Sequence, residues 1–152
     1  MAYEPLVSMQ EGGDKQVVAS GGELEVQSGG IVDIQAGAKV TFPMIEVTTS
    51  TTVTAAQSGA TFLLKAVDLK MTLPSTAAGL RYTFIVHTVS TTTGAQIDPA
   101  AADAIHYATS VDDKDLINTP ATDVEGDAVT VVGDGDAGWW VESTVGTWAK
   151  EA

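Results

Sequence analysis

Residues 18–42 read VASGGELEVQSGGIVDIQAGAKVTF and contain three copies of an eight-residue unit. Each copy begins with a small tripeptide, first SGG, again SGG, and then AGA. The apolar residues keep the same register: one column holds Leu24, Val32 and Val40, and the next holds Val26, Ile34 and Phe42. Apolar and polar residues that alternate between glycine turns predict short strands with one apolar face.

The length of the turns follows from which residues face each other. A two-residue loop at residues 29–30 would place Val26 opposite Asp33, on the same face of the ribbon. A three-residue loop instead places Val26 opposite Val32, and every cross-strand partner is then apolar. Eight-residue rungs stacked in parallel, as in a β-solenoid, preserve the same columns. Both arrangements give residues 18–43 a flat β-repeat ribbon with one apolar side.

This ribbon is too small to be stable alone. Domains below roughly 40 residues usually need disulfides, metals or partners, and the chain has no cysteine. We expect the same ribbon from other chains to cover the apolar columns, since short repeats stack readily around a symmetry axis. The alternative is a hairpin meander at the edge of a monomeric β domain. The expected oligomer interface comprises Leu24, Val26, Val32, Ile34, Val40 and Phe42.

Composition and charge exclude several classes of function. The 152 residues carry 20 acidic and 7 basic side chains, a formal net charge of -13. Such a negative surface repels phosphate backbones and anionic membranes, so we expect neither nucleic acid nor a membrane as partner. The first residues lack the basic and then apolar character of a signal peptide, which predicts synthesis in a cytoplasm without the usual secretion route.

The remaining chain divides into three parts. Residues 1–17 look like an arm, with Leu6, Val7 and Met9 as apolar anchors and a glycine-rich break at residues 12–14. Residues 44–58 are rich in threonine and form either an extended connection or an exposed strand, and we place a domain boundary there. Residues 59–152 contain longer strand patterns without the eight-residue period.

The third part predicts a small all-β domain, a sandwich or a barrel. Its strongest strand pattern is at residues 81–89, where Tyr82, Phe84 and Val86 alternate with Ile85 and His87. Further strands are expected at 61–65, 69–73, 128–132 and 139–143, and residues 100–104 permit one helical turn at most.

No catalytic motif stands out in the sequence. His87, His106 and Asp103 are the residue types of a Ser–His–Asp site, but no G-x-S-x-G motif accompanies them. A lone histidine on a strand is more often a packed or surface residue. We therefore predict no catalytic residues and no cofactor.

Two features of the C-terminal part deserve a structural test. Asp134 and Asp136 alternate within GDGDAG, which suits either a calcium loop or a hairpin turn, and we favour the turn because the other calcium-loop positions are missing. We therefore predict no metal site. Trp139 and Trp140 are adjacent in a strand, so one points inward and the other outward, and the outward one is a candidate contact residue for a sugar.

The ribbon and the later strands together resemble proteins of tailed-bacteriophage virions. The repeat stretch SGGELEVQSGGIVDI is similar to repeats near the N-termini of such proteins, and the second half is similar to a small β domain that recurs in them. The marks of the second half are LP at 73–74, AGLRYTF at 78–84, IDPA at 97–100, GDAV at 126–129, GWWV at 138–141 and GTW at 146–148. In size and layout the chain most resembles capsid decoration (cement) proteins.

The resemblance implies a homotrimer, with β-helix-like ribbons intertwined, on the outer face of a phage capsid. Its partners would be its own copies and the major capsid protein, and its role would be to stabilise the shell of a virion made in the host cytoplasm. Tyr3, Leu6, Val7 and Met9 of the arm would contact the capsid. The alternative is a fibre, tail or receptor-binding module that contacts a host glycan or surface protein.

Overall fold

A computed structural model describes residues 42–90, 92–107, 114–136 and 138–151, together with two short strands nearer the N-terminus. The chain divides into two compact units, residues 1–40 and 41–152. In the first unit, β1 (Val7–Met9) pairs antiparallel with β2 (Gln16–Val18), Ser8 lying opposite Val17. One strand of this pair therefore lies on each side of the glycine-rich break of the predicted arm, and β2 ends at Val18, one residue beyond the arm.

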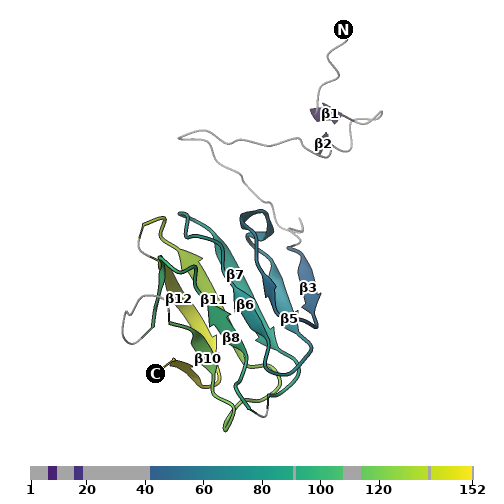
Figure 1. The fold of residues 1–152 in the computed structure, drawn as a ribbon. Coiled ribbons are helices and arrows are strands. Elements are labelled where there is room, and N and C mark those ends of the chain that lie inside the picture. Colours follow the sequence, from purple (N-terminus) through teal and green to yellow (C-terminus); the bar gives the residue numbers. More distant parts are fainter. Residues whose placement is uncertain are drawn as a thin grey trace. The chain divides into compact units, whose positions relative to one another are not determined.

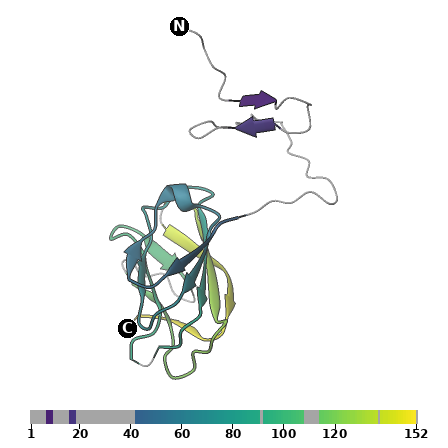
Figure 2. The ribbon, with the colours of Figure 1, turned by 90° about the vertical axis from the view of Figure 1, so that its right-hand side faces the viewer.

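The second unit is a β-sandwich of two mixed sheets (Figures 1 and 2). The first sheet has six strands in the order β3 (Met44–Val47), β5 (Thr61–Leu64), β7 (Arg81–Val86), β11 (Ala128–Gly133), β12 (Gly138–Val145) and β9 (Ala104–His106). The second sheet has five strands in the order β13 (Trp148–Lys150), β10 (Leu116–Asn118), β8 (Gln96–Asp98), β6 (Lys70–Thr72) and β4 (Thr51–Thr52). One short 3-10 helix, η1 (Ala55–Gln57), follows β4.

The first half of the sandwich is built like a solenoid, because successive strands alternate between the two sheets. The chain runs β3, β4, β5, β6, β7 and β8, with odd strands in the first sheet and even strands in the second. Within each sheet these strands are parallel neighbours. Residues 44–98 thus form three rungs, where a rung is one strand of the first sheet followed by one of the second.

Parallel pairing without a register shift stacks like residues on one another from rung to rung. Ile45 pairs with Phe62 and Phe62 with Phe84, so that these side chains form one inward column. The Phe62 and Phe84 rings are stacked, with centroids 5.3 Å apart and planes 21° apart. Such aligned aromatic pairs add about 0.5–1.5 kcal/mol beyond the area they bury. Met71 pairs with Ile97 in the same way in the second sheet.

The second half of the unit closes the sandwich with mostly antiparallel strands. β11 pairs with β7 and β12 with β11, while β10 pairs with β8 and β13 with β10, all antiparallel. β9 is the exception, because it runs parallel to β12 at the edge of the first sheet. The tight hairpin from β11 to β12 passes through the GDGDAG turn predicted from the sequence.

The all-β class and the principal strands are as predicted. Tyr82, Phe84 and Val86 are buried on β7, while Ile85 and His87 point away from the core, which confirms the alternation predicted there. Two sheets that pack face to face make the unit a sandwich. In the part of the chain that the structure describes, no helix is long and apolar enough to cross a membrane.

The sequence and the structure differ at residues 44–58. The sequence predicted either an extended connection or an exposed strand there, with a domain boundary. These residues supply β3, β4 and η1 of the sandwich, and the two compact units divide between residues 40 and 41. Val47 and Val53 lie in the common core, and the carbonyl of Thr54 accepts a hydrogen bond of 3.1 Å from the buried Tyr82 hydroxyl. The two-residue strand β4 lies among threonines and has no detectable period, so only its parallel pairing with β6 places it in the second sheet.

A pair of glycine substitutions tests how tightly the loops close on the second sheet. Gly94 and Gly79 have nearly the same backbone angle, φ +81° and +82°. A Cβ on Gly94 would overlap the carbonyl oxygen of Asn118, but a Cβ on Gly79 meets nothing within 4 Å. Both substitutions by alanine share a left-handed penalty of about 1–2 kcal/mol. We expect Gly94→Ala to cost about 2 kcal/mol more than Gly79→Ala, from overpacking.

Urea unfolding of both variants measures this difference directly, because the backbone penalty cancels between them. Equal losses of stability in the two variants would contradict the close contact between residues 94 and 118.

Candidate functional site

β12 presents two adjacent tryptophans in opposite environments. Trp139 is fully buried and its ring lies 5.5 Å from that of Tyr82 in the core, whereas Trp140 is 54% exposed. This confirms the prediction that one points inward and the other outward. Trp140 is therefore the outward aromatic residue and the starting point of the candidate site.

The Trp140 ring rests on a histidine from the neighbouring strand. β9 runs parallel to β12 with His106 directly beside Trp140. The two rings are stacked, with centroids 4.3 Å apart and planes 24° apart. The parallel pairing is possible because Gly138 begins β12, since a Cβ at that position would overlap the carbonyl oxygen of Ala104. The stack covers one face of the indole.

Asp134 holds the edge of the same indole. Trp140 Nε1 donates a hydrogen bond of 3.0 Å to Asp134 Oδ2. Asp134 Oδ1 in turn accepts the backbone N–H groups of Asp136 at 2.9 Å and Gly138 at 3.1 Å. The Asp136 N–H is the largest cause that lowers the pKa of Asp134 to about 2, followed by the Gly138 N–H and the indole.

These bonds show the hairpin turn that the sequence favoured for the GDGDAG string. Asp134 uses its carboxylate to close the hairpin turn and to orient Trp140, as a turn aspartate commonly does. Asp136 is exposed. Among the residues that the structure describes, no three His, Cys, Asp or Glu side chains gather in a way that could hold a metal ion.

Thr76 and the buried Asp103 connect the turn to the rest of the sandwich through hydrogen bonds. Thr76 Oγ1 donates a hydrogen bond of 2.8 Å to the carbonyl of Gly138. The N–H of Thr76 donates one of 2.7 Å to Asp103 Oδ2, and Asp103 is buried.

We call the group of Trp140, His106 and Asp134 the tryptophan platform. The His106 ring and the Asp134 carboxylate both contact Trp140, and two backbone N–H groups hold Asp134.

The three residues considered for catalysis each contact other residues of the fold, and the structure does not bring them together in one site. Asp103 supports the turn, and His106 stacks under Trp140. His87 follows β7 and lies 3.8 Å from the Glu125 carboxylate at the surface. The expectation that the protein is not an enzyme stays a prediction.

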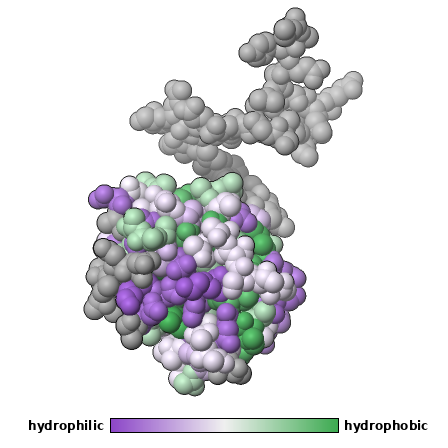
Figure 3. Space-filling model, viewed as in Figure 1, coloured by the Kyte–Doolittle hydropathy of each residue, from purple (hydrophilic) through white to green (hydrophobic). Residues whose placement is uncertain are grey.

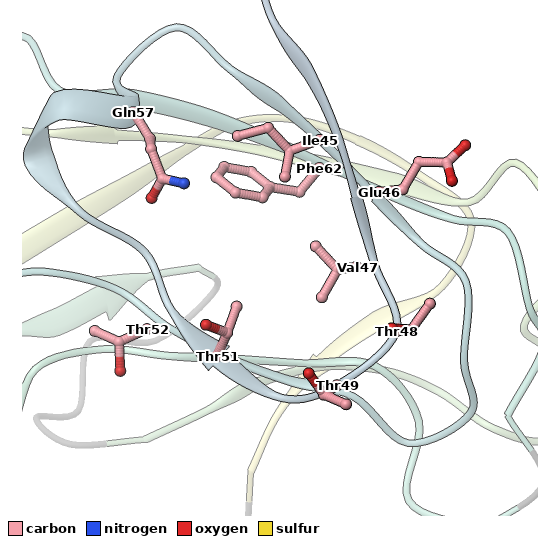
Figure 4. A pocket seen from close by; sticks show the side chains of 9 residues that line it. All are labelled: Ile45, Glu46, Val47, Thr48, Thr49, Thr51, Thr52, Gln57 and Phe62. Atoms are coloured by element: carbon pink, nitrogen blue, oxygen red, sulfur yellow. The ribbon is translucent and has the colours of Figure 1, made fainter.

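A second feature lies at the opposite edge of the first sheet, where the first rung is open. A cavity of about 270 Å³ lies between β3 and β4 (Figure 4). Ile45, Val47 and Phe62 point toward it, and Glu46 points away. The complete lining comprises Ile45, Glu46, Val47, Thr48, Thr49, Thr51, Thr52, Gln57 and Phe62. Among the described strands, none pairs with the outer edge of β3 or of β4.

Of the predicted interface residues, only Phe42 is described. Phe42 is 64% exposed and its ring lies over Gly59, while the nearby Met44 is 63% exposed. Leu24, Val26, Val32, Ile34 and Val40 lie outside the described residues, as do Tyr3 and Leu6 of the arm. Val7 and Met9 belong to β1. The oligomer and capsid contacts therefore stay predictions.

Comparison with models of known protein families finds no match, and comparison with curated protein sequences finds none either.

Sequence reasoning found Trp140 but not its contacts with Asp134 and His106. The signal for Asp134 was available, because an aspartate four residues before a glycine in a hairpin turn often accepts backbone N–H groups. No signal pointed to His106, since a parallel pairing between β9 and β12 joins segments 34 residues apart. That pairing exists only in the folded sandwich.

The low pKa of Asp134 gives a testable pH dependence. Its folded value of about 2 lies below the usual 3.8, so its stabilising effect is complete above about pH 4 and is lost as the pH falls through 2. We expect the indole N–H resonance of Trp140 to titrate with a midpoint near 2. The indole of Trp148 donates to the carbonyl of Val145 and serves as an internal control that does not titrate.

The Asp134→Asn variant should remove this titration, while Asp136→Asn should retain it because only the backbone of residue 136 takes part. A Trp140 midpoint near 3.8 in the unmodified protein would show that the carboxylate does not hold the turn.

Proposed function

We propose that this protein is a structural virion protein of a tailed bacteriophage, which binds the outer surface of the capsid as a homotrimer and stabilises the shell. The proposal rests on the resemblance of the repeat ribbon and the ordered marks of the second half to capsid decoration proteins. The observation that carries it is the self-complementary pair of apolar columns in residues 18–42.

Phe42, the last residue of the apolar columns and the only one that the structure describes, supports this proposal. Phe42 ends the second column, and the sandwich that begins beside it leaves Phe42 largely exposed. A large aromatic side chain in that position gains stability when another surface covers it, at about 25 cal/mol per Å² of apolar area. Copies of the same ribbon around a threefold axis are the cover that we propose.

The sandwich suits the outward part of such a trimer. The whole chain carries 20 acidic and 7 basic residues, and hydrophilic residues cluster near the middle of the face of the sandwich seen in Figure 3. A negatively charged, cysteine-free sandwich remains soluble at high local concentration, which a densely decorated particle requires.

The mechanism of stabilisation is mass action. A subunit that binds the assembled shell, but not its dissociated parts, favours the assembled state, and the gain at each site grows with the logarithm of the subunit concentration relative to Kd. Three arms held together in one trimer convert weak single contacts into strong binding, because the second and third contacts form at a high effective concentration.

The oligomeric state is the first test. We expect the purified protein to have three times the mass of one chain in sedimentation or light scattering. Ile34→Asp places a charge in an apolar column and should dissociate the trimer, because an unpaired buried carboxylate is strongly unfavourable. Asp33→Asn, one residue away in the polar column, is the matched control and should leave the trimer intact. Well-folded single subunits of the unmodified protein would overturn the oligomeric proposal.

Capsid binding is the second test. We expect the trimer to co-sediment with undecorated phage shells at a saturable ratio and to raise the temperature at which they break open. Removing residues 1–16 should abolish co-sedimentation while the trimer remains, since the arm makes the proposed contacts. A trimer that stays in solution with every shell tested, but attaches to host cells, would favour the fibre or receptor-binding alternative.

A further inference from the structure

The tryptophan platform keeps a large aromatic ring at the surface in one orientation. Trp140 is 54% exposed although its neighbour Trp139 is fully buried. Its ring is held by the His106 stack at 4.3 Å and by the 3.0 Å bond to Asp134. When a ligand binds a ring that is already fixed in place, no conformational entropy of that side chain is lost on binding. The platform is therefore preorganised for contact.

The rim of the platform supplies hydrogen-bond acceptors. Asp134 Oδ2 meets the indole N–H in the plane of the ring, and the exposed Asp136 lies in the same turn. Ionised carboxylates accept hydrogen bonds and donate none, so they suit a ligand that is rich in hydroxyl groups. The same carboxylates, with the net charge of -13, repel anionic ligands.

A pyranose ring combines the two complementary properties. One face of the sugar presents C–H groups that carry partial positive charge, which matches the negative face of the indole. The hydroxyl groups around the sugar can donate to the carboxylates at the rim. A peptide would instead prefer a groove, but the cavity lined by Ile45, Val47 and Phe62 lies at the other edge of the sheet, beside β3.

We propose that Trp140, held by His106 and Asp134, binds the ring of a neutral sugar in a cell-surface or extracellular glycan. This activity goes beyond shell stabilisation and does not depend on it. On a particle with many copies, sites with millimolar affinity would act together through avidity. The decorated shell would then adhere to glycan-bearing surfaces.

The experiment is an NMR titration of the full chain with defined oligosaccharides. The probes are the neutral trisaccharides maltotriose, cellotriose and N,N′,N″-triacetylchitotriose, with the anionic sialyllactose as the test of charge. We expect at least one neutral probe to shift the Trp140 indole resonance with a dissociation constant of about 1 mM. The buried indoles of Trp139 and Trp148 should not shift. Sialyllactose should bind more weakly.

Three variants of β12 separate stacking from general surface effects. Trp140→Ala should weaken binding by about tenfold or more, as expected when a central aromatic contact is removed. Trp140→Phe keeps an aromatic face and should retain part of the affinity. Val145→Ala removes an exposed apolar side chain of the same strand, 60% exposed, and should bind as the unmodified protein does. Far-UV circular dichroism checks that each variant is folded.

Two results would overturn the proposal. One is that no neutral probe shifts the Trp140 resonance at about 10 mM, ten times the expected dissociation constant. The other is that Trp140→Ala and the unmodified protein bind the same probe equally well. In the first case, binding of a proline-rich peptide to Trp140 would assign the platform to a protein partner instead of a glycan. Failure of these tests leaves capsid co-sedimentation unaffected, so the two proposals fail independently.

Discussion

The sandwich depends on the stacking of equivalent apolar side chains between parallel strands. Ile45, Phe62 and Phe84 occupy the same position in three successive rungs, and they fill the space between the sheets as one column. Each rung contributes too few residues to bury its own apolar face. The column is stable only because the next rung covers it, and the antiparallel β11 finally closes it through Val129, which pairs with Phe84. The first half of the unit therefore has the logic of a solenoid, and the second half supplies its cap.

This construction leaves the two edges of the first sheet in different states. At the β3 edge nothing among the described strands continues the stack, so a cavity opens beside Ile45 and Val47, and Phe42 and Met44 are exposed. At the β9 edge the sheet ends in a parallel strand whose His106 supports Trp140. An open stack favours further β-structure or another chain, whereas a single fixed aromatic ring favours a small, flat ligand. The glycan proposal concerns the β9 edge, whereas the trimer proposal concerns residues 18–42, of which the exposed Phe42 comes just before β3.

Polar groups fix the loops that the stacking leaves unpaired. Lys70 of β6 lies 2.8 Å from Asp115 and 3.5 Å from Asp98, so that one cation joins β6 to β8 and to the residue before β10. The hydrogen bond to Asp115 raises the pKa of Lys70, which keeps the lysine charged. In the β11–β12 turn, the Asp134 carboxylate likewise joins parts of the chain, but it binds the backbone N–H groups of Asp136 and Gly138 and not a cation. In both cases a carboxylate positions a neighbouring group.

Periodicity along the chain was sufficient to predict the all-β class, the strands around Tyr82 and Val131, and the opposite orientation of Trp139 and Trp140. These features depend on the alternation of side chains within one strand, which is a local property. The turn through Asp134 was also predictable, because the hydrogen bonds of its carboxylate reach no further along the chain than residue 140.

Tertiary structure alone decided which segments are neighbours. Residues 44–58 have the composition of a linker, yet parallel pairing with β5 and β6 makes them the first rung. His106 lies on a short strand with no recognisable motif, yet its pairing with Trp140 completes the platform. Parallel pairing joins residues that are far apart in sequence and leaves no turn signature between them. Its free energy comes from the apolar column that all the rungs share, so it exists only when the whole sandwich has formed.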